Sequence, residues 1–248
     1  MRLLFINPNI SESVSSLIAG EARRSAPAGV EIEVLTAPFG VAYIETRFEA
    51  LIGAYAAAQL AAEHHERFDA VVVAAFGDPG LAGLREALPV PVTGLTESAL
   101  ASAQLLGQRF SIIAISHRIQ AWYREVVTAN GVAGRLASIR SLEQPLQRIG
   151  AVQADHAPAL QALAERAVHE DGADVIVLAG APLAGLARSL QGRMPVPVVD
   201  GVSSAVHHAA TLVAMNAGKA TRGSFARPPA KPNQGLPAAF VRLLQGGA

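Results

Sequence analysis

Two stretches of the chain repeat the same short sequence motifs in the same order, and this repetition constrains the fold more than any other feature. The motifs Leu-Ala-Gly-Leu and Pro-Val-Pro-Val occur within residues 81–92 and again within residues 183–198. In each copy a Ser-Ala pair begins nine residues beyond the first proline of the second motif, at Ser98 and at Ser204. Shared motifs with a matched interval between them predict an internal duplication.

Short apolar runs typical of β-strands alternate along the chain with longer stretches of helical character. This alternation predicts parallel β-α-β units, and the continuous apolar character of the runs is typical of a sheet covered on both faces. Strands are predicted at 3–6, 31–35, 70–74, 92–93, 110–115, 136–139, 175–178 and 198–199. Helices are predicted at about 13–24, 47–66, 97–106, 120–130, 157–170, 182–191 and 203–217.

The beginnings of the two copies also correspond. The segments 2–9 and 109–116 each run from an arginine through an apolar strand to a polar residue. The predicted fold is therefore α/β, with two similar, duplicated and pseudo-symmetric open parallel-sheet lobes and a ligand cleft between them. The predicted domains are a first lobe of residues 1–95 plus 206–248, which includes a C-terminal arm, and a second lobe of residues 96–205.

Local signals predict several element ends. Ser11 or Ser13 is expected to cap the first helix, and Asn130 with the glycine after it is expected to end another. Pro158 is interpreted as lying in the first turn of its helix, where proline is tolerated. The proline-rich segment 227–237 is typical of an extended arm. Apolar residues after it are expected to dock the arm on the body or on a neighbour: Phe240, Val241, Leu243 and Leu244.

Composition excludes several functional classes. The net charge is zero and the pI is about 7.1, so the basic surface that binds nucleic acid or an acidic membrane is not predicted. No apolar run approaches the ~20 residues of a membrane span, and the run at 3–6 is too short for a signal peptide, so a cytoplasmic location is expected. Because 51% of the residues are hydrophobic, a large core and a homo-oligomer are expected.

Two loop motifs and the duplicated layout resemble the aspartate/glutamate/hydantoin racemase superfamily, in particular hydantoin and allantoin racemases. The motifs are Asn7-Pro8-Asn9 and Phe76-Gly77-Asp78-Pro79-Gly80, and the resemblance covers about residues 1–217. It implies a cofactor-independent isomerase acting at the α-carbon of a small hydantoin, imide or carboxylate. In that family one thiol lies on each side of the reacting carbon, and the matching positions here are Ala75 and Gly180.

The resemblance also implies where a ligand binds, at the carboxyl ends of the strands, where ligands collect in open α/β sheets. The residues implied around one small anion, hydantoin or imide are Asn9, Ala75, Phe76, Gly77, Asp78, Ser116, His117, Gly180 and Ala181. The Asn9 amide offers donors to a ligand, with a plain Asx-turn as the alternative. Pro182 begins a helix whose free N–H groups suit an anion, with a tight turn as the alternative.

His117 and Asp78 are the candidates for proton transfer at this site, because imidazole and carboxylate groups act as general acids and bases. For His117 the alternative is a solvated histidine at a helix start. For Asp78 the alternative is a carboxylate that accepts backbone hydrogen bonds and fixes the turn before Leu81. Glu45 and Glu97 are reserve candidates, with structural roles as the alternative.

The chain contains no cysteine, which excludes disulfides and thiolate metal ligands. No metal is predicted, because the histidines lack partners at ligand spacing. Either the subgroup dispenses with a thiol at Ala75, or alanine replaces a cysteine to give an inactive variant. Residues 180–183 depart from the family's Cys-Ala-Gly-Met at three of four positions, which indicates natural loss. Three functions therefore stay open: an isomerase, a non-catalytic binding protein, and a decarboxylase or lyase with one proton donor.

Overall fold

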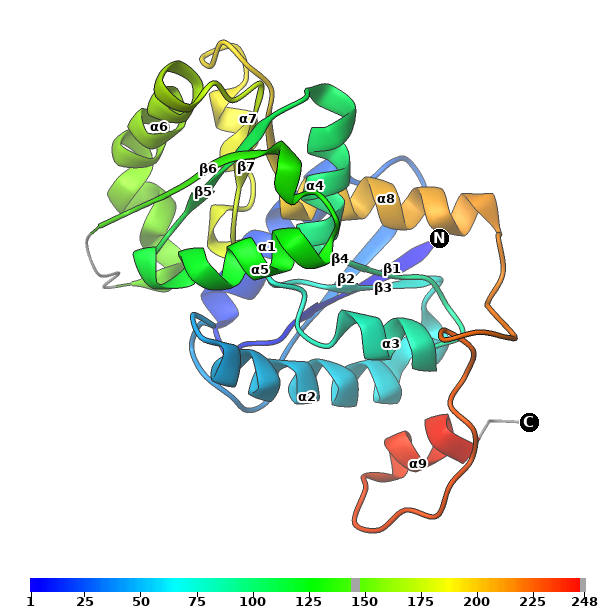
Figure 1. Ribbon diagram of the computed structural model, residues 1–248. Helices are drawn as coiled ribbons and strands as arrows, with labels where there is room; N and C mark the ends of the chain where they lie inside the picture. The colour runs from blue at the N-terminus through cyan, green and yellow to red at the C-terminus, as the bar shows by residue number, and fades with distance from the viewer. Residues whose placement is uncertain (144–147, 246–248) are drawn as a thin grey trace.

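Two parallel four-stranded sheets with the same strand order form the framework of the computed structural model, which describes residues 1–143 and 148–245 (Figure 1). The first sheet has the order β2-β1-β3-β4 and contains β1 (Arg2–Asn7), β2 (Glu31–Thr36), β3 (Ala70–Val73) and β4 (Val92–Gly94). The second has the order β6-β5-β7-β8 and contains β5 (Phe110–Ala114), β6 (Leu136–Ser141), β7 (Val175–Leu178) and β8 (Val198–Asp200). The predicted α/β fold with two similar lobes is confirmed, and every predicted strand is present.

Helices connect and cover the strands. They are α1 (Glu12–Ser25), α2 (Arg47–His64), α3 (Leu81–Ala87), α4 (Leu95–Leu106), α5 (Gln120–Ala129), α6 (Val152–Asp171), α7 (Leu186–Leu190), α8 (Gly201–Met215) and α9 (Ala238–Gln245). Short 3₁₀ turns occur at 65–67, 117–119, 133–135, 149–151 and 181–183. Ser11 caps α1, because its hydroxyl accepts from the Val14 N–H at 3.4 Å. Asn130 ends α5, and Gly131 follows with φ +72°.

Two helical predictions were wrong in detail, and two helices were missed. Helix α6 begins at Val152, so Pro158 lies inside the helix rather than in its first turn. The Ala154 carbonyl there loses the N–H that residue 158 would otherwise donate. The predicted helix at 182–191 is a 3₁₀ turn followed by α7, because Gly185 between them has φ +83°. Helices α3 and α9 were not predicted.

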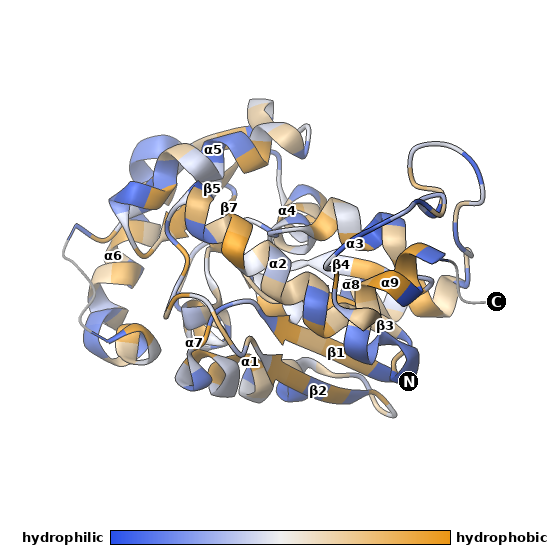
Figure 2. Cartoon of the chain, turned by 90° about the horizontal axis from the view of Figure 1, so that it is seen from below, coloured by the Kyte–Doolittle hydropathy of each residue, from blue (hydrophilic) through white to orange (hydrophobic). Residues whose placement is uncertain are grey.

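The helix that follows the last strand of each sheet packs on the other sheet. Helix α4 follows β4 of the first sheet, yet its Ala99, Leu100 and Ala103 belong to the core around β5 and β7. Helix α8 follows β8 of the second sheet, yet Val202 and Val206 belong to the core around β1 and β3. The two helices also contact each other (Figure 1). The strands they cover are strongly apolar (Figure 2), as a sheet buried on both faces requires.

The C-terminal arm docks on the body of its own chain. Residues 217–237 contain neither helix nor strand. Helix α9 then packs against α2, where Ala239 and Leu243 are buried and Phe240 contacts Tyr55. The expected docking of the apolar end of the arm is confirmed, whereas residues 246–248 of the predicted first lobe lie outside the described residues. Within the described ranges, no helix has both the length and the apolar character needed to cross a membrane.

Candidate functional site

In each lobe the two central strands end side by side, so the predicted loops that follow them are neighbours. In the first lobe the Ala74 N–H donates to the Ile6 carbonyl at 2.8 Å, so the segment after β1 lies beside the segment after β3. In the second lobe the Ala179 N–H donates to the Ile113 carbonyl at 2.9 Å. The equivalence of these bonds follows from the identical strand order. Residues 7–9 therefore neighbour the 75–80 loop, as residues 115–117 neighbour the turn at 180.

The loop after β3 reaches into the second lobe. Phe76 is 4% exposed and belongs to the core of that lobe, with its ring centroid 4.8 Å from that of Tyr123 on α5. Gly77 has φ +104°, and a Cβ atom added there would lie 2.4 Å from a Trp122 ring carbon. Only glycine fits this close approach of backbone to indole. The 75–80 loop is thus held between its own sheet and α5.

The equivalent turn after β7 reaches in the opposite direction. Ala181, which corresponds to Phe76, is buried in the core of the first lobe. A Cβ atom added at Gly180 would lie 3.5 Å from Pro182 Cδ and 4.0 Å from Ile115 Cδ1. Each lobe therefore contributes a loop to the core of the other, and Phe76 and Ala181 lie at the boundary between the lobes.

The two positions that match the family thiols have different backbones. Ala75 is 8% exposed, and its φ is not among the positive values of the chain. Gly180 has φ +114° and ψ 138°, a conformation that residues with a side chain rarely adopt. The backbone at position 75 does not exclude a residue with a side chain such as cysteine, whereas position 180 would have to change its backbone to hold one.

Asn9 forms the Asx-turn that was the alternative to ligand contact. It is 6% exposed, and its Oδ1 accepts from the Ser11 N–H at 2.9 Å and from Asn7 Nδ2 at 3.1 Å. Its Nδ2 donates no hydrogen bond to another described residue. The turn fixes the amide with its donor uncommitted, so the structural role and a ligand role are compatible.

Two backbone N–H groups at equivalent positions are also uncommitted. In the described part of the chain, neither the Phe76 nor the Ala181 N–H has a hydrogen-bond acceptor. Both residues directly follow a thiol-equivalent position. N–H groups placed in this way can stabilise a carboxylate or a developing enolate oxygen.

Asp78 is occupied as a hydrogen-bond acceptor. Its Oδ1 accepts from the Thr96 N–H and its Oδ2 from the Glu97 N–H, each at 2.9 Å. The backbone-acceptor interpretation is confirmed, although the partners are at the start of α4 rather than in the turn before Leu81. Burial raises the pKa of Asp78 to about 7, against the opposing effect of the two N–H donors.

The other titratable candidates lie at the edge of this region. His117 is exposed at the start of a 3₁₀ turn, which confirms the solvated histidine, and the neighbouring Ser116 hydroxyl accepts from the Arg118 N–H at 3.2 Å. Glu97 forms an ion pair with Arg85 and accepts from the Gly94 N–H at 3.3 Å, a structural role.

Tyr123 and Trp122 border the site and were not predicted. Burial, together with the charges of Asp78 and Glu45, raises the pKa of the Tyr123 hydroxyl. Burial and the nearby carboxylates of Glu45 and Glu49 raise the pKa of Tyr43 in the same way. The only available signal was that Trp122 is the single tryptophan of a chain poor in aromatic residues.

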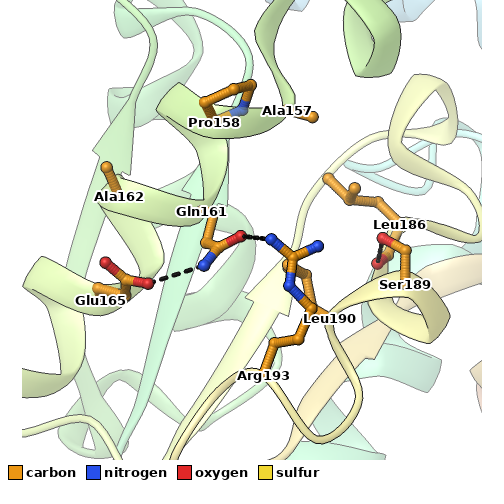
Figure 3. A pocket seen from close by; sticks show the side chains of 9 residues that line it. All are labelled: Ala157, Pro158, Gln161, Ala162, Glu165, Leu186, Ser189, Leu190 and Arg193. Atoms are coloured by element: carbon orange, nitrogen blue, oxygen red, sulfur yellow. Dashed lines mark hydrogen bonds between the residues drawn. The ribbon is translucent and has the colours of Figure 1, made fainter.

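The lobes are also joined across this region by an ion pair. Arg47 at the start of α2 donates through Nε to Glu125 on α5 at 2.8 Å. Four surface pockets contain none of the nine residues implied around the ligand, although the reserve candidate Glu97 lines one of them. One, of about 290 Å³, lies between α6 and α7 and includes Gln161 and Arg193 (Figure 3).

Among residues 1–143 and 148–245, no cluster of three or more carboxylate or imidazole groups is placed to hold a metal ion.

Comparison with known proteins shows relatives with the same layout. The family model described as Asp/Glu/Hydantoin racemase matches residues 3–209. A hydantoin racemase from Paenarthrobacter aurescens is 35% identical over 236 residues, 93% of this chain and 99% of that protein. The structure of allantoin racemase from Klebsiella pneumoniae superposes with a TM-score of 0.91 at 32% identity, covering 99% of this chain and 100% of that one. Allantoin racemase from Pseudomonas fluorescens gives 0.87 at 34% identity, covering 95% and 100%.

Proposed function

Because the chain belongs to the Asp/Glu/Hydantoin racemase family, we propose that it binds a small hydantoin, imide or carboxylate between its lobes without racemising it through two thiols. The observation that carries the second part is the backbone of Gly180, whose φ of +114° suits glycine and disfavours cysteine. The loops at 7–9 and 76–80 support the first part, because they keep the family's motifs and lie at the lobe boundary.

Ligand recognition in this proposal uses groups that have no hydrogen-bond partner among the described residues. Asn9 Nδ2 and the N–H groups of Phe76 and Ala181 donate to the oxygen atoms of the carboxylate or imide. Neither alanine at position 75 nor glycine at position 180 can accept or deliver a proton. The carboxylate of Asp78 has both oxygens engaged by α4, so it does not replace the missing thiols. No cofactor enters the proposal.

The proposal predicts binding without exchange at the α-carbon. Titration calorimetry with enantiopure 5-methylhydantoin is expected to show saturable binding, weakened about tenfold by Asn9→Ala through loss of one hydrogen bond to a charged or polarised oxygen. In D₂O, deuterium uptake at C5 is expected to equal the rate without protein. Protein-dependent uptake with inversion would show that another acid–base pair has replaced the thiols, and absence of binding would remove the ligand assignment.

A decarboxylase or lyase with one proton donor is the second candidate, for a form of the chain that carries cysteine at position 75, and the unequal backbones at positions 75 and 180 favour it. A carbanion formed by loss of CO₂ needs one proton from one side. The backbone at Ala75 accommodates a thiol, whereas that at Gly180 does not. A relative of this chain with cysteine at position 75 alone would therefore have the geometry for such a reaction.

We also propose that the protein is a homo-oligomer, on the evidence of α2. The middle of this helix, residues 50–58, is apolar on all sides, and a helical surface of that kind is normally buried. Yet Phe48 is 72% exposed, Leu51 is 68% exposed and Tyr55 is 47% exposed on one stripe of the helix. Helix α9 contacts α2 near Tyr55 through Phe240. A second copy of the chain is the proposed partner for the uncovered stripe.

Association through α2 is expected to depend on this stripe. Sedimentation velocity at micromolar concentration should give a species larger than the 25.7 kDa chain, and Phe48→Glu with Leu51→Glu should shift it toward the monomer because charges are costly in an apolar interface. The control is Leu105→Glu, which changes a leucine on α4 that is 82% exposed and lies outside this stripe. A single monomeric species for the unaltered chain would refute the association.

A further inference from the structure

The first turn of α4 is capped by a residue from a different loop. Helix α4 begins after Gly94, which has no side chain to accept its first N–H groups. The carboxylate of Asp78 accepts two of them instead, from Thr96 and Glu97. The first N–H groups of every helix have no acceptor within the helix, and the side chain of the residue just before the helix normally accepts from one of them.

The second lobe solves the same problem locally. Helix α8 occupies the duplicated position, and its cap residue Asp200 accepts from the Ser203 N–H at 2.9 Å. Gly94 and Asp200 thus occupy equivalent positions before α4 and α8. Gly94 has no side chain that could cap its helix, whereas the Asp200 side chain caps α8. The duplication shows that a local cap fits this strand-to-helix junction, so capping alone does not explain why Asp78 comes from a distant loop.

The geometry around Gly94 makes the two solutions mutually exclusive. A Cβ atom added at Gly94 would lie 2.3 Å from the Asp78 carboxyl carbon, so any side chain there would displace the loop. Asp78 itself has φ +48°, a value that aspartate tolerates better than most residues. The Gly77 N–H adds a third link, donating to the Thr96 hydroxyl at 2.6 Å. The loop is therefore fixed to α4 at three points.

From these contacts we propose that Asp78 is a positioning residue, which holds the 75–80 loop against α4 so that the Phe76 N–H faces the ligand. The ligand part of this inference rests on the proposed function. The loop part does not, because Phe76 and Gly77 pack on Tyr123 and Trp122 whether or not a ligand is bound.

Moving the cap separates the two roles of Asp78. Asp78→Ala should remove the cap and release the loop. Asp78→Ala combined with Gly94→Asp should restore a local cap as in the second lobe, because Gly94 has φ −121° and ψ 165°, which suit an N-cap aspartate. Asp78→Ala is expected to lower the melting temperature by about 2–6 °C. The combined variant is expected to recover the original melting temperature, whereas the loop stays displaced.

Trp122 reports the loop position without any ligand. It is the only tryptophan, is 8% exposed and lies over Gly77. Acrylamide quenching of its fluorescence is expected to increase in both Asp78 variants. Asp200→Ala is the matched control, because it removes a helix cap elsewhere and should lower the melting temperature without changing the quenching. In calorimetry, 5-methylhydantoin should bind about tenfold more weakly to both Asp78 variants.

Two results would overturn the proposal. One is recovery of normal quenching in the combined variant, which would make Asp78 a helix cap only. The other is equal quenching in Asp78→Ala and Asp200→Ala, which would reduce the effect to general destabilisation. If the unaltered protein does not bind 5-methylhydantoin, the proposed function fails, but the fluorescence comparison still decides whether Asp78 positions the loop.

Discussion

Replacing Glu21 by Gln is expected to lower the free energy of unfolding by about 2–3 kcal/mol, among the largest effects of any single polar substitution in this chain. The Glu21 side chain is 1% exposed on α1. It accepts from Arg188 on α7 at 2.8 Å, from Ser25 at 2.9 Å and from Arg24 at 2.9 Å. The variant would leave two arginines without their shared carboxylate and would remove a buried link between the lobes. Urea unfolding measures the loss.

The same substitution should change the dependence of stability on pH. Burial tends to raise the pKa of Glu21, but hydrogen bonds from Arg188, Ser25 and Arg24 outweigh it, so the folded pKa is below the ordinary 4.5. A carboxyl group whose pKa is lower in the folded state stabilises the fold above its unfolded pKa, and that stability is lost as pH falls through the folded pKa. Glu21→Gln should remove this loss below about pH 4.5.

A surface glutamate provides the control for Glu21. Glu31 pairs with Arg2 at 3.7 Å, and its side chain is 79% exposed. Glu31→Gln is therefore expected to change the unfolding free energy by less than about 0.5 kcal/mol. Equal effects of the two substitutions would show that the buried link between the lobes contributes no more than an exposed ion pair.

Ala75→Cys is expected to create proton exchange at the α-carbon of the ligand, on one face only. The exchange rate should rise from the uncatalysed background to a rate that depends on the protein. A thiolate at position 75 can remove the α-proton of one enantiomer of a bound 5-methylhydantoin and return a deuteron to the same face. No group at position 180 can protonate the other face. The measurement is deuterium incorporation in D₂O by NMR with the optical rotation followed in parallel. Uptake with retention is expected for one enantiomer only.

Two further variants test the geometric basis of this result. Ala75→Ser should stay at background, because a hydroxyl is far less acidic than a thiol. Ala75→Cys combined with Gly180→Cys should add little racemisation, because φ at position 180 is +114° and a side chain there forces the backbone to move. Rapid racemisation by the combined variant would mean that the turn after β7 readily adopts another conformation.

The sequence predicts the fold well wherever local pattern and tertiary structure agree. The central strands β1, β3, β5 and β7 are apolar runs that are buried on both faces, so their pattern alone identifies them. The α6 start was missed because Pro158 signals a first turn, while packing of α6 against its sheet tolerates the lost hydrogen bond. Helix α3 was missed because seven residues give too short a pattern.

The site was predictable only where motifs lie next to strand ends. Asn9 and the 76–80 loop follow their strands directly, so topology places them at one edge. The contacts of Asp78 with Thr96 and Glu97 were not predictable, because they join residues separated by 18 and 19 positions. Tyr123 was missed for a similar reason, since its place depends on how α5 packs on a loop of the other lobe.

The exchange of α4 and α8 between the two sheets has a consequence for biosynthesis. One face of the first sheet is covered partly by α1 and partly by α8, so this cover is incomplete until α8, which ends at Met215, has left the ribosome. Folding of the N-terminal half is therefore coupled to synthesis of the second half. Each half receives part of its cover from the other, as two separate molecules do in a helix-swapped dimer.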